Sequence, residues 1–168
     1  MKEIIELSNN EITICRNEFL KVKGSTDTNV YYVESGSLRI FVLDDYEERT
    51  IRFGYKENII VSMDSFLTGK PSDLYIQAIK KTVVKVITKP QIDKFLDSES
   101  NRSLWIKILE NLVLQQLDRE IDILTSSPKE RYERVLKRSP QLFQEISNRH
   151  IANYLRMSAE TLSRLKKS

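Results

Sequence analysis

The side chains best suited to chemistry gather near the end of the chain, in the stretch SNRHIANYLRMSAETLSRLKKS. Ten of the 27 Lys and Arg residues, but only four of the 24 Asp and Glu residues, lie in residues 128–168. This segment therefore has a net charge of +6, while the rest of the chain has −3. Such a segment is suited to meet the phosphates of a polyanion, or it is a solvated basic surface. The charge alone favours neither interpretation.

The residue types that serve catalysis or metal binding are sparse. His150 is the single histidine, whereas a metal site in a strand-rich domain commonly needs two or three. The four glycines are scattered and form neither a nucleophile elbow nor a phosphate-binding loop. The single Cys15 has no partner for an internal disulfide and no metal-ligand spacing. We therefore expect no catalytic residue, no metal and no cofactor, and we expect His150 to be an ordinary surface residue.

The composition is that of an ordinary soluble protein. Hydrophobic residues make up 40% and charged residues 30% of the chain, and no apolar run approaches the roughly 20 residues that span a bilayer. The start, MKEIIELSNN, has acidic residues within its apolar run and no small-residue cleavage site, unlike a secretion signal. Together with the lone cysteine, these features predict a cytoplasmic protein with no membrane partner.

Residues 11–87 contain many short segments with the pattern of strands. In RTIRFGY, the residues Ile51, Phe53 and Tyr55 share one face, and LDDYEE supplies a polar hairpin connection. Many short strands with few helices among them predict an antiparallel barrel or jelly roll. The predicted strands are EFLKVKG, VYYVESG, SLRIFVLDD, ERTIRFGY, NIIVSM, LYIQAI and TVVKVIT.

A helical pattern replaces this alternation after residue 87. In TKPQIDKFL, Thr88 and Gln91 have the spacing of a capping box. A longer helix is predicted from Ser98 to about Thr125, where neither Pro nor Gly occurs. About 28 residues would give a helix of about 42 Å.

This long helix has two apolar sides. The apolar spacing of 3, 4 and 3 residues is that of a narrow coiled-coil seam, formed by Leu114, Leu117, Ile121 and Leu124. A neighbouring side carries Trp105, Leu109, Leu112 and Val113. One side could rest on the barrel, and the seam is best covered by its copy in a second subunit, which predicts a twofold homodimer. Because the seam is shorter than three heptads, a helix buried wholly within one monomer is the alternative.

The last 42 residues contain several short helices with clear start signals. Ser127 with Glu130 has the form of a capping box, and Pro128 sits at the first helical position. Ser139 and Pro140 end this helix, a second helix covers residues 142–146, and Ser147 is expected to cap the third. The remaining apolar residues allow two short helices to cross steeply around a common core, with Ala152 at the closest approach. These residues are Ile151, Ala152, Leu155, Met157, Leu162 and Leu165.

This order of elements resembles the Crp/Fnr-type transcription regulators over nearly the whole chain. YYVESGSLRIF is similar to the family's glycine-marked strand pair around Gly36, and SAETLSR is similar to the start of its recognition helix. The resemblance implies an α+β protein with an antiparallel, cyclic-nucleotide-binding-like jelly roll in residues 1–97 and a long dimerisation helix in 98–126. It implies a helix-turn-helix domain in 127–168, and the chain has no residues left for the wing strand that many members add.

The resemblance also implies double-stranded DNA as a partner. By family position Glu160 and Arg164 are base readers, which accept from cytosine and donate to guanine, and Thr161 contacts phosphate. Ser158 would cap the reading helix and point its first turn at DNA. The full predicted set of DNA-binding residues is Arg149, Ser158, Glu160, Thr161, Ser163, Arg164, Lys166 and Lys167. The alternative is an exposed helix face stabilised by a Glu160–Arg164 pair at i, i+4.

Both predicted sites depart from the family pattern. The turn between the two last helices has Arg156 where a glycine is usual, so Arg156 bears a strain of about 1 kcal/mol or the turn is reshaped. In the sensor domain, relatives hold the ribose with a glutamate and the cyclic phosphate with an arginine. This chain has Ser62 at the place of the glutamate and Val61 where a glycine is usual, and the segment of the arginine holds Ser72, Asp73 and Leu74, so both charged anchors are missing.

The effector pocket is therefore expected to differ from that of nucleotide-binding relatives. We expect it around Ser62, Met63, Ser72 and Asp73, lined by the loop SMDSFLTGKPSD. Asp73 would repel a phosphate. We predict that this pocket binds a small molecule other than a canonical cyclic nucleotide, or none.

The predicted function is that of a DNA-binding transcription regulator and not of an enzyme. RNA polymerase is a further candidate partner implied by the resemblance. The alternative is a ligand-sensing or protein-interaction module whose helix-turn-helix no longer reads DNA.

Overall fold

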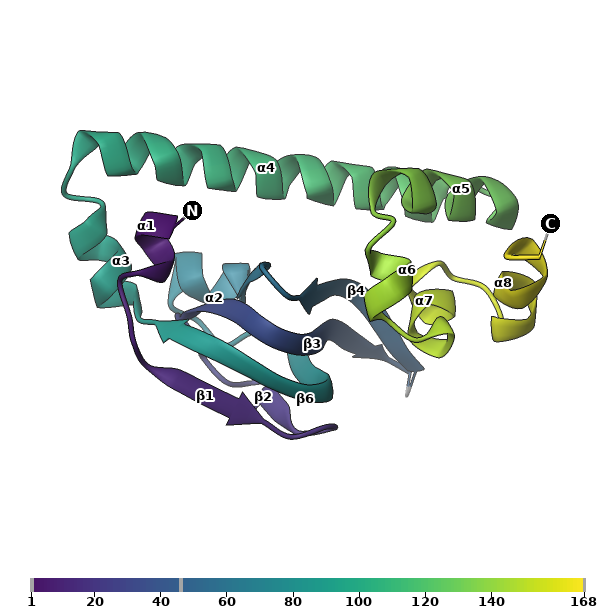
Figure 1. Cartoon of the computed structure of the whole chain (residues 1–168), viewed down its shortest axis with the longest axis horizontal. Helices are drawn as coiled ribbons and strands as arrows, with labels where there is room; N and C mark the ends of the chain where they lie inside the picture. The colour runs from purple at the N-terminus through teal and green to yellow at the C-terminus, as the bar shows by residue number, and fades with distance from the viewer. Residues whose placement is uncertain (1, 46, 168) are drawn as a thin grey trace. The chain divides into compact units, whose positions relative to one another are not determined.

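The computed structural model describes residues 2–45 and 47–167. The chain forms two compact units, the first ending at Arg102 and the second beginning at Ser103 (Figure 1). The first unit contains all the strands and the second contains most of the long helix and the short helices that follow it. The elements of the first unit are α1 (Lys2–Ile5), β1 (Glu11–Ile14), β2 (Phe19–Lys21), β3 (Val30–Asp44), β4 (Glu47–Tyr55), β5 (Ile59–Val61), α2 (Met63–Thr68), β6 (Tyr75–Ile87) and α3 (Lys89–Phe95).

All the strand pairs in the first unit are antiparallel, and two long strands organise them. The first half of β3 pairs with β5 and with the second half of β6, which also pairs with β1. The second half of β3 pairs with β4 and with the first half of β6, which also pairs with β2. Two four-stranded layers therefore share β3 and β6, which confirms the predicted antiparallel jelly roll.

The core of this unit lies on the inward faces of these shared strands. Leu38 and Ile40 of β3 and Ile76 and Ala78 of β6 are all at most 5% exposed and belong to one apolar cluster. Arg39, between these two β3 residues, points to the other face of the strand, where it donates to Gln77 at 2.9 Å and lies over the buried Phe41 ring. Successive residues therefore alternate between the two faces of the strand, and in this half of β3 both faces are covered.

Gly36 lies where the two halves of β3 meet. Its φ is +90°, and a Cβ atom there would be 2.4 Å from the Lys81 carbonyl oxygen and 2.5 Å from Thr82 Cα. The buried Thr82 hydroxyl accepts from the Ser37 N–H at 3.0 Å and donates to the Lys80 carbonyl at 2.7 Å. Glycine is thus required both by the backbone angle and by the close approach of β6.

The structure corrects three local predictions in this unit. VYYVESG and SLRIFVLDD are one strand, β3, and LYIQAI and TVVKVIT are one strand, β6, so their separation was wrong. The sequence suggests a turn at Gly36, but β3 continues through this position, and its pairing with β6 changes register there. The segment SMDSFLTGKPSD is not only loop, because α2 forms within it and buries Ser65 and Phe66.

Other local predictions in the first unit agree with the structure. The Gln91 side chain accepts from the Thr88 N–H at 2.8 Å at the start of α3, as the capping-box spacing predicts. β3 and β4 form the predicted hairpin, of which Tyr46 lies outside the described residues.

The helices of the second unit match the predicted ones closely. Ser127 Oγ accepts from the Glu130 N–H at 3.3 Å, and Pro128 begins α5 as predicted. Ser147 occupies the predicted N-cap position, but its side chain makes no capping hydrogen bond. His150 is half-buried, not fully on the surface as expected. The elements are α4 (Glu99–Leu124), α5 (Pro128–Arg138), α6 (Leu142–Glu145), α7 (Asn148–Tyr154) and α8 (Ala159–Leu165).

Buried charged groups join the end of α4 to the short helices. The Asp122 side chain is fully buried and accepts from Arg134 Nε at 3.1 Å and from Arg138 Nη2 at 2.5 Å. Arg119, 4% exposed, lies with its guanidinium carbon 3.7 Å from the centroid of the Tyr154 ring. The last turns of α4 are therefore fixed to α5 by ion pairs and to α7 by a cation–π contact.

Substituting Gly36 with alanine is expected to lower the free energy of unfolding by about 2–4 kcal/mol, because the new methyl group adds overpacking to an unfavourable φ. Gly24→Ala is the matched control. Gly24 also has a positive φ, of 82°, but a Cβ there would meet nothing within 4 Å, so the loss should be about 1 kcal/mol. Urea unfolding followed by far-ultraviolet circular dichroism measures both losses, and equal losses would contradict the role of the close approach.

Candidate nucleic-acid interface and effector site

The turn between α7 and α8 keeps its shape although it lacks a glycine. Arg156 has a φ of +55°, so it bears the left-handed conformation. The Met157 N–H donates to the Ala152 carbonyl at 3.0 Å, and the Arg156 N–H donates to the Asn153 carbonyl at 3.1 Å. These two bonds form a Schellman motif, the usual way to end a helix with a left-handed residue. Of the two possibilities left open by the sequence, the structure has the strained turn.

Buried apolar residues hold α7 and α8 together. Ile151, Leu155 and Leu162 are fully buried, and Ala152 is 3% exposed. This core leaves the opposite face of α8 free to meet a partner.

Ser158 is the N-cap of α8, as predicted. Its hydroxyl accepts from the Thr161 N–H at 3.1 Å and lies 3.0 Å from the Thr161 hydroxyl. The cap therefore fixes the first turn of α8 and also engages the side chain of Thr161.

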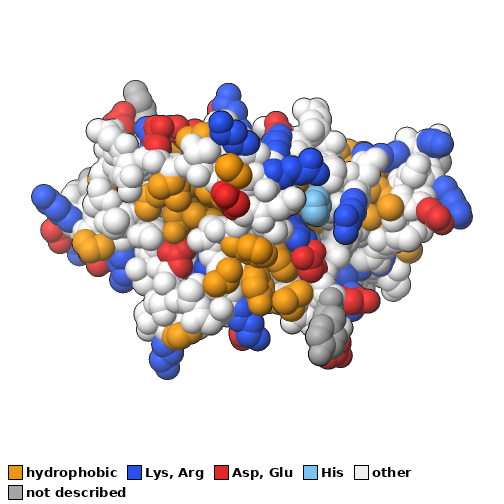
Figure 2. All heavy atoms as spheres, turned by 90° about the horizontal axis from the view of Figure 1, so that it is seen from below, with side chains coloured by type: hydrophobic (Ala, Val, Ile, Leu, Met, Phe, Trp, Pro, Cys, Tyr) orange, Lys and Arg blue, Asp and Glu red, His pale blue; other side chains and the backbone are white. Residues whose placement is uncertain are grey.

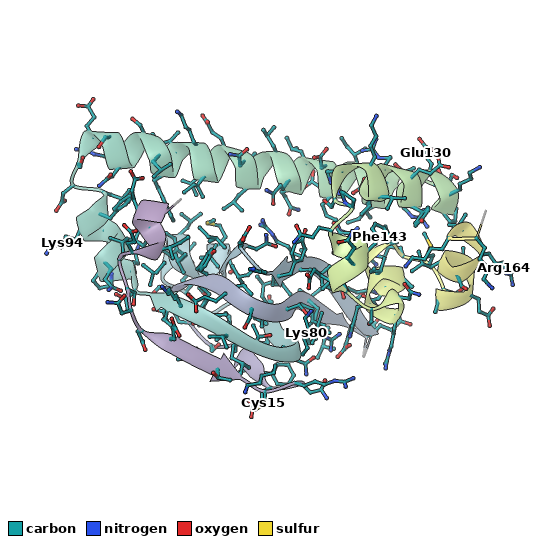
Figure 3. The ribbon with its side chains drawn as sticks, viewed as in Figure 1. Cys15, Lys80, Lys94, Glu130, Phe143 and Arg164 are labelled. Carbon is teal, nitrogen blue, oxygen red and sulfur yellow. The ribbon has the colours of Figure 1, made fainter. Side chains whose placement is uncertain are left out.

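The outward face of α8 carries Glu160, Ser163 and Arg164, all exposed. Arg164 Nη2 lies 3.9 Å from Glu160 Oε2, and both side chains are more than 80% exposed. Arg164 points away from the other helices in Figure 3. An ion pair so open to water is worth at most about 1 kcal/mol, so either side chain can leave it for a stronger partner.

The predicted phosphate-contacting residues fall into two groups. Arg149 and Lys167 are exposed, on α7 and just beyond α8. Lys166 instead donates to Asn148 Oδ1 at 2.5 Å and lies 5.5 Å from the centroid of the Phe143 ring. Lys and Arg side chains gather at the end of Figure 2 where α7 and α8 lie. Arg149 and Lys167 thus lie at the surface, whereas Lys166 has a partner within the fold.

The predicted seam of α4 is open to solvent in the chain as described. Its four residues are 49–81% exposed: Leu114, Leu117, Ile121 and Leu124. Beside them lies an open apolar hollow lined by Ile106, Leu109, Glu110, Val113 and Leu114. A large exposed apolar stripe of this kind is typical of a surface that meets another molecule.

In the sensor domain, two of the predicted pocket residues bind a carboxylate that the sequence analysis missed. Ser62 is fully buried and donates to Asp64 Oδ1 at 2.9 Å, and the buried Ser72 hydrogen-bonds to the same carboxylate. Burial opposes the charge of Asp64, but hydrogen bonds from Ser72, Ser62 and the Ser65 backbone outweigh it and lower the pKa of Asp64. The Asp64 carboxylate thus accepts hydrogen bonds from the hydroxyl groups of both Ser62 and Ser72.

A buried lysine faces this network. Lys21 is 3% exposed, and its ammonium group donates to the Ser25 carbonyl at 2.9 Å and lies 3.3 Å from the Ser25 hydroxyl. Burial lowers the pKa of Lys21, while the negative charges of Asp64, Asp27 and Asp73 oppose that shift. The positive charge of Lys21 is therefore offset by acidic groups of the protein.

The other two predicted pocket residues, Asp73 and Met63, have different surroundings. Asp73 is exposed and pairs with Lys23, Oδ1 to Nζ 3.0 Å. Met63 is half-buried as the first residue of α2. The local pattern could not reveal Lys21, because it comes from β2, far from the other residues in sequence, whereas Asp64 lies within the quoted loop and was overlooked.

The part of the chain that the structure describes contains neither a metal site nor a membrane-spanning helix. No group of three His, Cys, Asp or Glu side chains among residues 2–45 and 47–167 is arranged to hold a metal ion. No helix in the same part of the chain is both long and apolar enough to cross a membrane.

Asp64→Asn is expected to be less stable than the wild type at pH 7, by less than about 1 kcal/mol because water screens the exposed carboxylate. The folded-state pKa of Asp64 lies below its ordinary value of 3.8, so its contribution is present above pH 3.8 and is lost as the pH falls through the folded-state pKa. Urea midpoints at pH 7, 5 and 3 should therefore converge at the acid end. Asp73→Asn is the control, and a gap that persists unchanged at pH 3 would rule out the charge of Asp64 as its cause.

Comparison with known proteins agrees with this architecture. The family model of the cyclic nucleotide-binding domain matches residues 11–99, more than half of the chain. A comparison with curated protein sequences found no match. Among solved structures, FixK2 from Bradyrhizobium japonicum is 21% identical with a TM-score of 0.78, over 94% of this chain and 82% of that one.

Two further structures have the same arrangement. A CooA mutant from Carboxydothermus hydrogenoformans is 16% identical with a TM-score of 0.76, over 98% of this chain and 77% of that one. The c-di-GMP-responsive global regulator CLP from Xanthomonas campestris is 15% identical with a TM-score of 0.71, over 99% of this chain and 88% of that one. The chain belongs to the cyclic nucleotide-binding domain family and has the fold of the Crp/Fnr-type regulators.

Proposed function

We propose that this protein is a DNA-binding transcription regulator that acts as a twofold homodimer and whose sensor domain binds no canonical cyclic nucleotide. The observation that carries the proposal is α8, a capped helix that presents Glu160, Ser163 and Arg164 to solvent within a segment of net charge +6. The solved structure of CLP, which shares the fold, is described as that of a global regulator linked to gene expression.

Reading of DNA would use the outward face of α8 in the major groove. Arg164 would donate to the O6 and N7 atoms of guanine, and Glu160 would accept from the amino group of cytosine. Their mutual ion pair at 3.9 Å is weak and would open on binding.

Phosphate contacts would position this helix. Arg149 and Lys167, both exposed, are suited to grip the backbone on either side of the groove. Ser158 and Thr161 would add contacts at the first turn of α8. Lys166 would have to leave Asn148 to reach a phosphate.

The dimer would form along α4. Leu114, Leu117, Ile121 and Leu124 are 49–81% exposed, and burying them against a second copy would remove this apolar stripe from water. A twofold axis would then place two α8 helices about 34 Å apart, in successive major grooves.

The sensor domain would act without a cyclic nucleotide. Asp64 occupies the hydroxyl donors of Ser62 and Ser72, and its negative charge would repel an incoming cyclic phosphate. Any other effector would act only through differential affinity for two placements of the DNA-reading helices. Contact with RNA polymerase stays a prediction.

Sequencing the genomic fragments retained by the purified protein should yield a palindromic site. Arg164→Ala should reduce affinity for that site by about 5- to 150-fold and relax the preference at one base pair of each half-site, because a bidentate contact to guanine is lost. Titration of the selected and random duplexes over a range of salt concentrations measures both effects.

Lys167→Ala is the control for this experiment. It should weaken binding to selected and random duplexes alike and reduce the salt slope by about 1, as expected for a phosphate contact. Retention of no fragment above background would instead favour a ligand-sensing or protein-interaction module whose α8 does not read DNA.

Isothermal titration calorimetry with cyclic AMP and with cyclic GMP should give no heat of micromolar binding, since both charged anchors are absent and Asp64 is present. Nucleotide-binding relatives measured under the same conditions provide the positive control. Micromolar binding of either nucleotide would refute this part of the proposal.

A further inference from the structure

Arg131 of α5 binds four backbone carbonyl groups from two separate segments. Nη1 donates to the Thr125 carbonyl at 2.6 Å and to the Ser126 carbonyl at 3.0 Å, in the link between α4 and α5. On the other side, Nε donates to the Leu155 carbonyl at 2.9 Å and Nη2 to the Arg156 carbonyl at 3.1 Å. The side chain is only 8% exposed, so it is not available to touch DNA.

These carbonyl groups are ones that the helices leave without a partner. The Schellman motif at the end of α7 satisfies the carbonyls of Ala152 and Asn153, but those of Leu155 and Arg156 lie beyond it. A buried carbonyl without a hydrogen bond is costly, and bonds from a charged donor are stronger than neutral ones. Arg131 therefore completes the hydrogen bonding of the turn that joins the two helices of the motif.

One of these bonds, from Arg131 to the Arg156 carbonyl, acts on the strained residue Arg156. Arg156 has a φ of +55°, which is unfavourable for a residue with a Cβ atom, and nothing in its own side chain relieves this strain. The bond from Arg131 Nη2 to the Arg156 carbonyl fixes the peptide group that follows the strained angle. α8 begins only three residues later, so a change in that peptide group would re-aim the reading helix.

We propose that Arg131 is a positioning residue for DNA reading, which holds Arg156 in the left-handed conformation and so sets the direction of α8. This inference rests on the proposed function. Arg131 acts through Arg156 and not through contact with DNA.

Lysine cannot replace Arg131 in this role. The guanidinium group is a planar fork with five donors, and Arg131 uses three nitrogens to reach two segments. A lysine ammonium is a single point with three donors and would serve one segment at a time. The Asp122 pairs with Arg134 and Arg138 hold α4 and α5 together independently, so the helices should persist when Arg131 is changed.

The test compares Arg131→Lys, Arg156→Gly and the double variant with the wild type. Arg131→Lys should bind the selected DNA site at least about tenfold more weakly, with an unchanged salt slope because the phosphate contacts are retained. Arg156→Gly alone should stay within about threefold of the wild type, since glycine adopts a positive φ without strain. In the double variant, glycine should recover much of the lost specific affinity.

Lys129→Arg is the matched control, a conservative exchange on the same helix at an exposed position whose side chain pairs only weakly with Glu133. It should leave DNA binding unchanged. Hydrogen exchange of the Arg156 and Met157 amides gives a readout that needs no DNA, and it should be faster in Arg131→Lys and unchanged in Lys129→Arg.

Recovery by glycine decides the proposal, whether or not Arg131→Lys folds by itself. A double variant that regains specific binding supports it, and a double variant no better than Arg131→Lys overturns it. Wild-type-like affinity and amide exchange in Arg131→Lys also overturn it. If the wild type itself prefers no DNA sequence, the proposed function fails, and amide exchange still reports whether Arg131 holds the turn.

Discussion

The pairing of β3 with β6 along nearly their whole length constrains everything else in the first unit. Because both strands serve two layers, their halves must change register where the layers meet, and this happens beside Gly36. The approach of β6 to Gly36 allows no side chain there. The position of β5, and therefore of α2 and its Asp64, follows from the first half of β3. This close contact between two backbones thus bears on where Ser62 and Asp64 lie.

Paired polar groups hold local structure in both units. In the first unit the buried hydroxyl groups of Ser62 and Ser72 hydrogen-bond to the carboxylate of Asp64, which is itself exposed. In the second unit the fully buried carboxylate of Asp122 is paired with Arg134 and Arg138. Burying a charge is costly unless it is paired and hydrogen-bonded, so the Asp122 pairs have few alternative arrangements.

The local features of this fold could be predicted from sequence, because they depend on residues three or four positions apart. The caps at Ser127 and Ser158 and the exposed seam of α4 are of this kind. The continuity of β3 through Gly36 could not be predicted, because a glycine there reads as a turn until the approach of β6 is known.

The residues of the candidate site also divide into those that could be predicted from the sequence and those that could not. The outward residues of α8 follow from helical spacing and from the resemblance to a known family. Arg131 was missed because its partners are backbone carbonyls 24 and 25 residues away, which have no side-chain signature. Lys21 comes from β2 and Asp64 from α2, elements far apart in the sequence, so no local pattern relates the two charges.

The ion pair between Glu160 and Arg164 also bears on how the protein would search a genome. Opposite charges on one face largely cancel at a distance, so α8 itself would attract DNA little, and the long-range attraction would come from residues such as Arg149 and Lys167. A protein held mainly by phosphate contacts slides and hops between sites. On a wrong sequence the Glu160 carboxylate would be desolvated without a donor, which would favour release. This weak, exposed ion pair would thus keep the residence time on non-cognate DNA short.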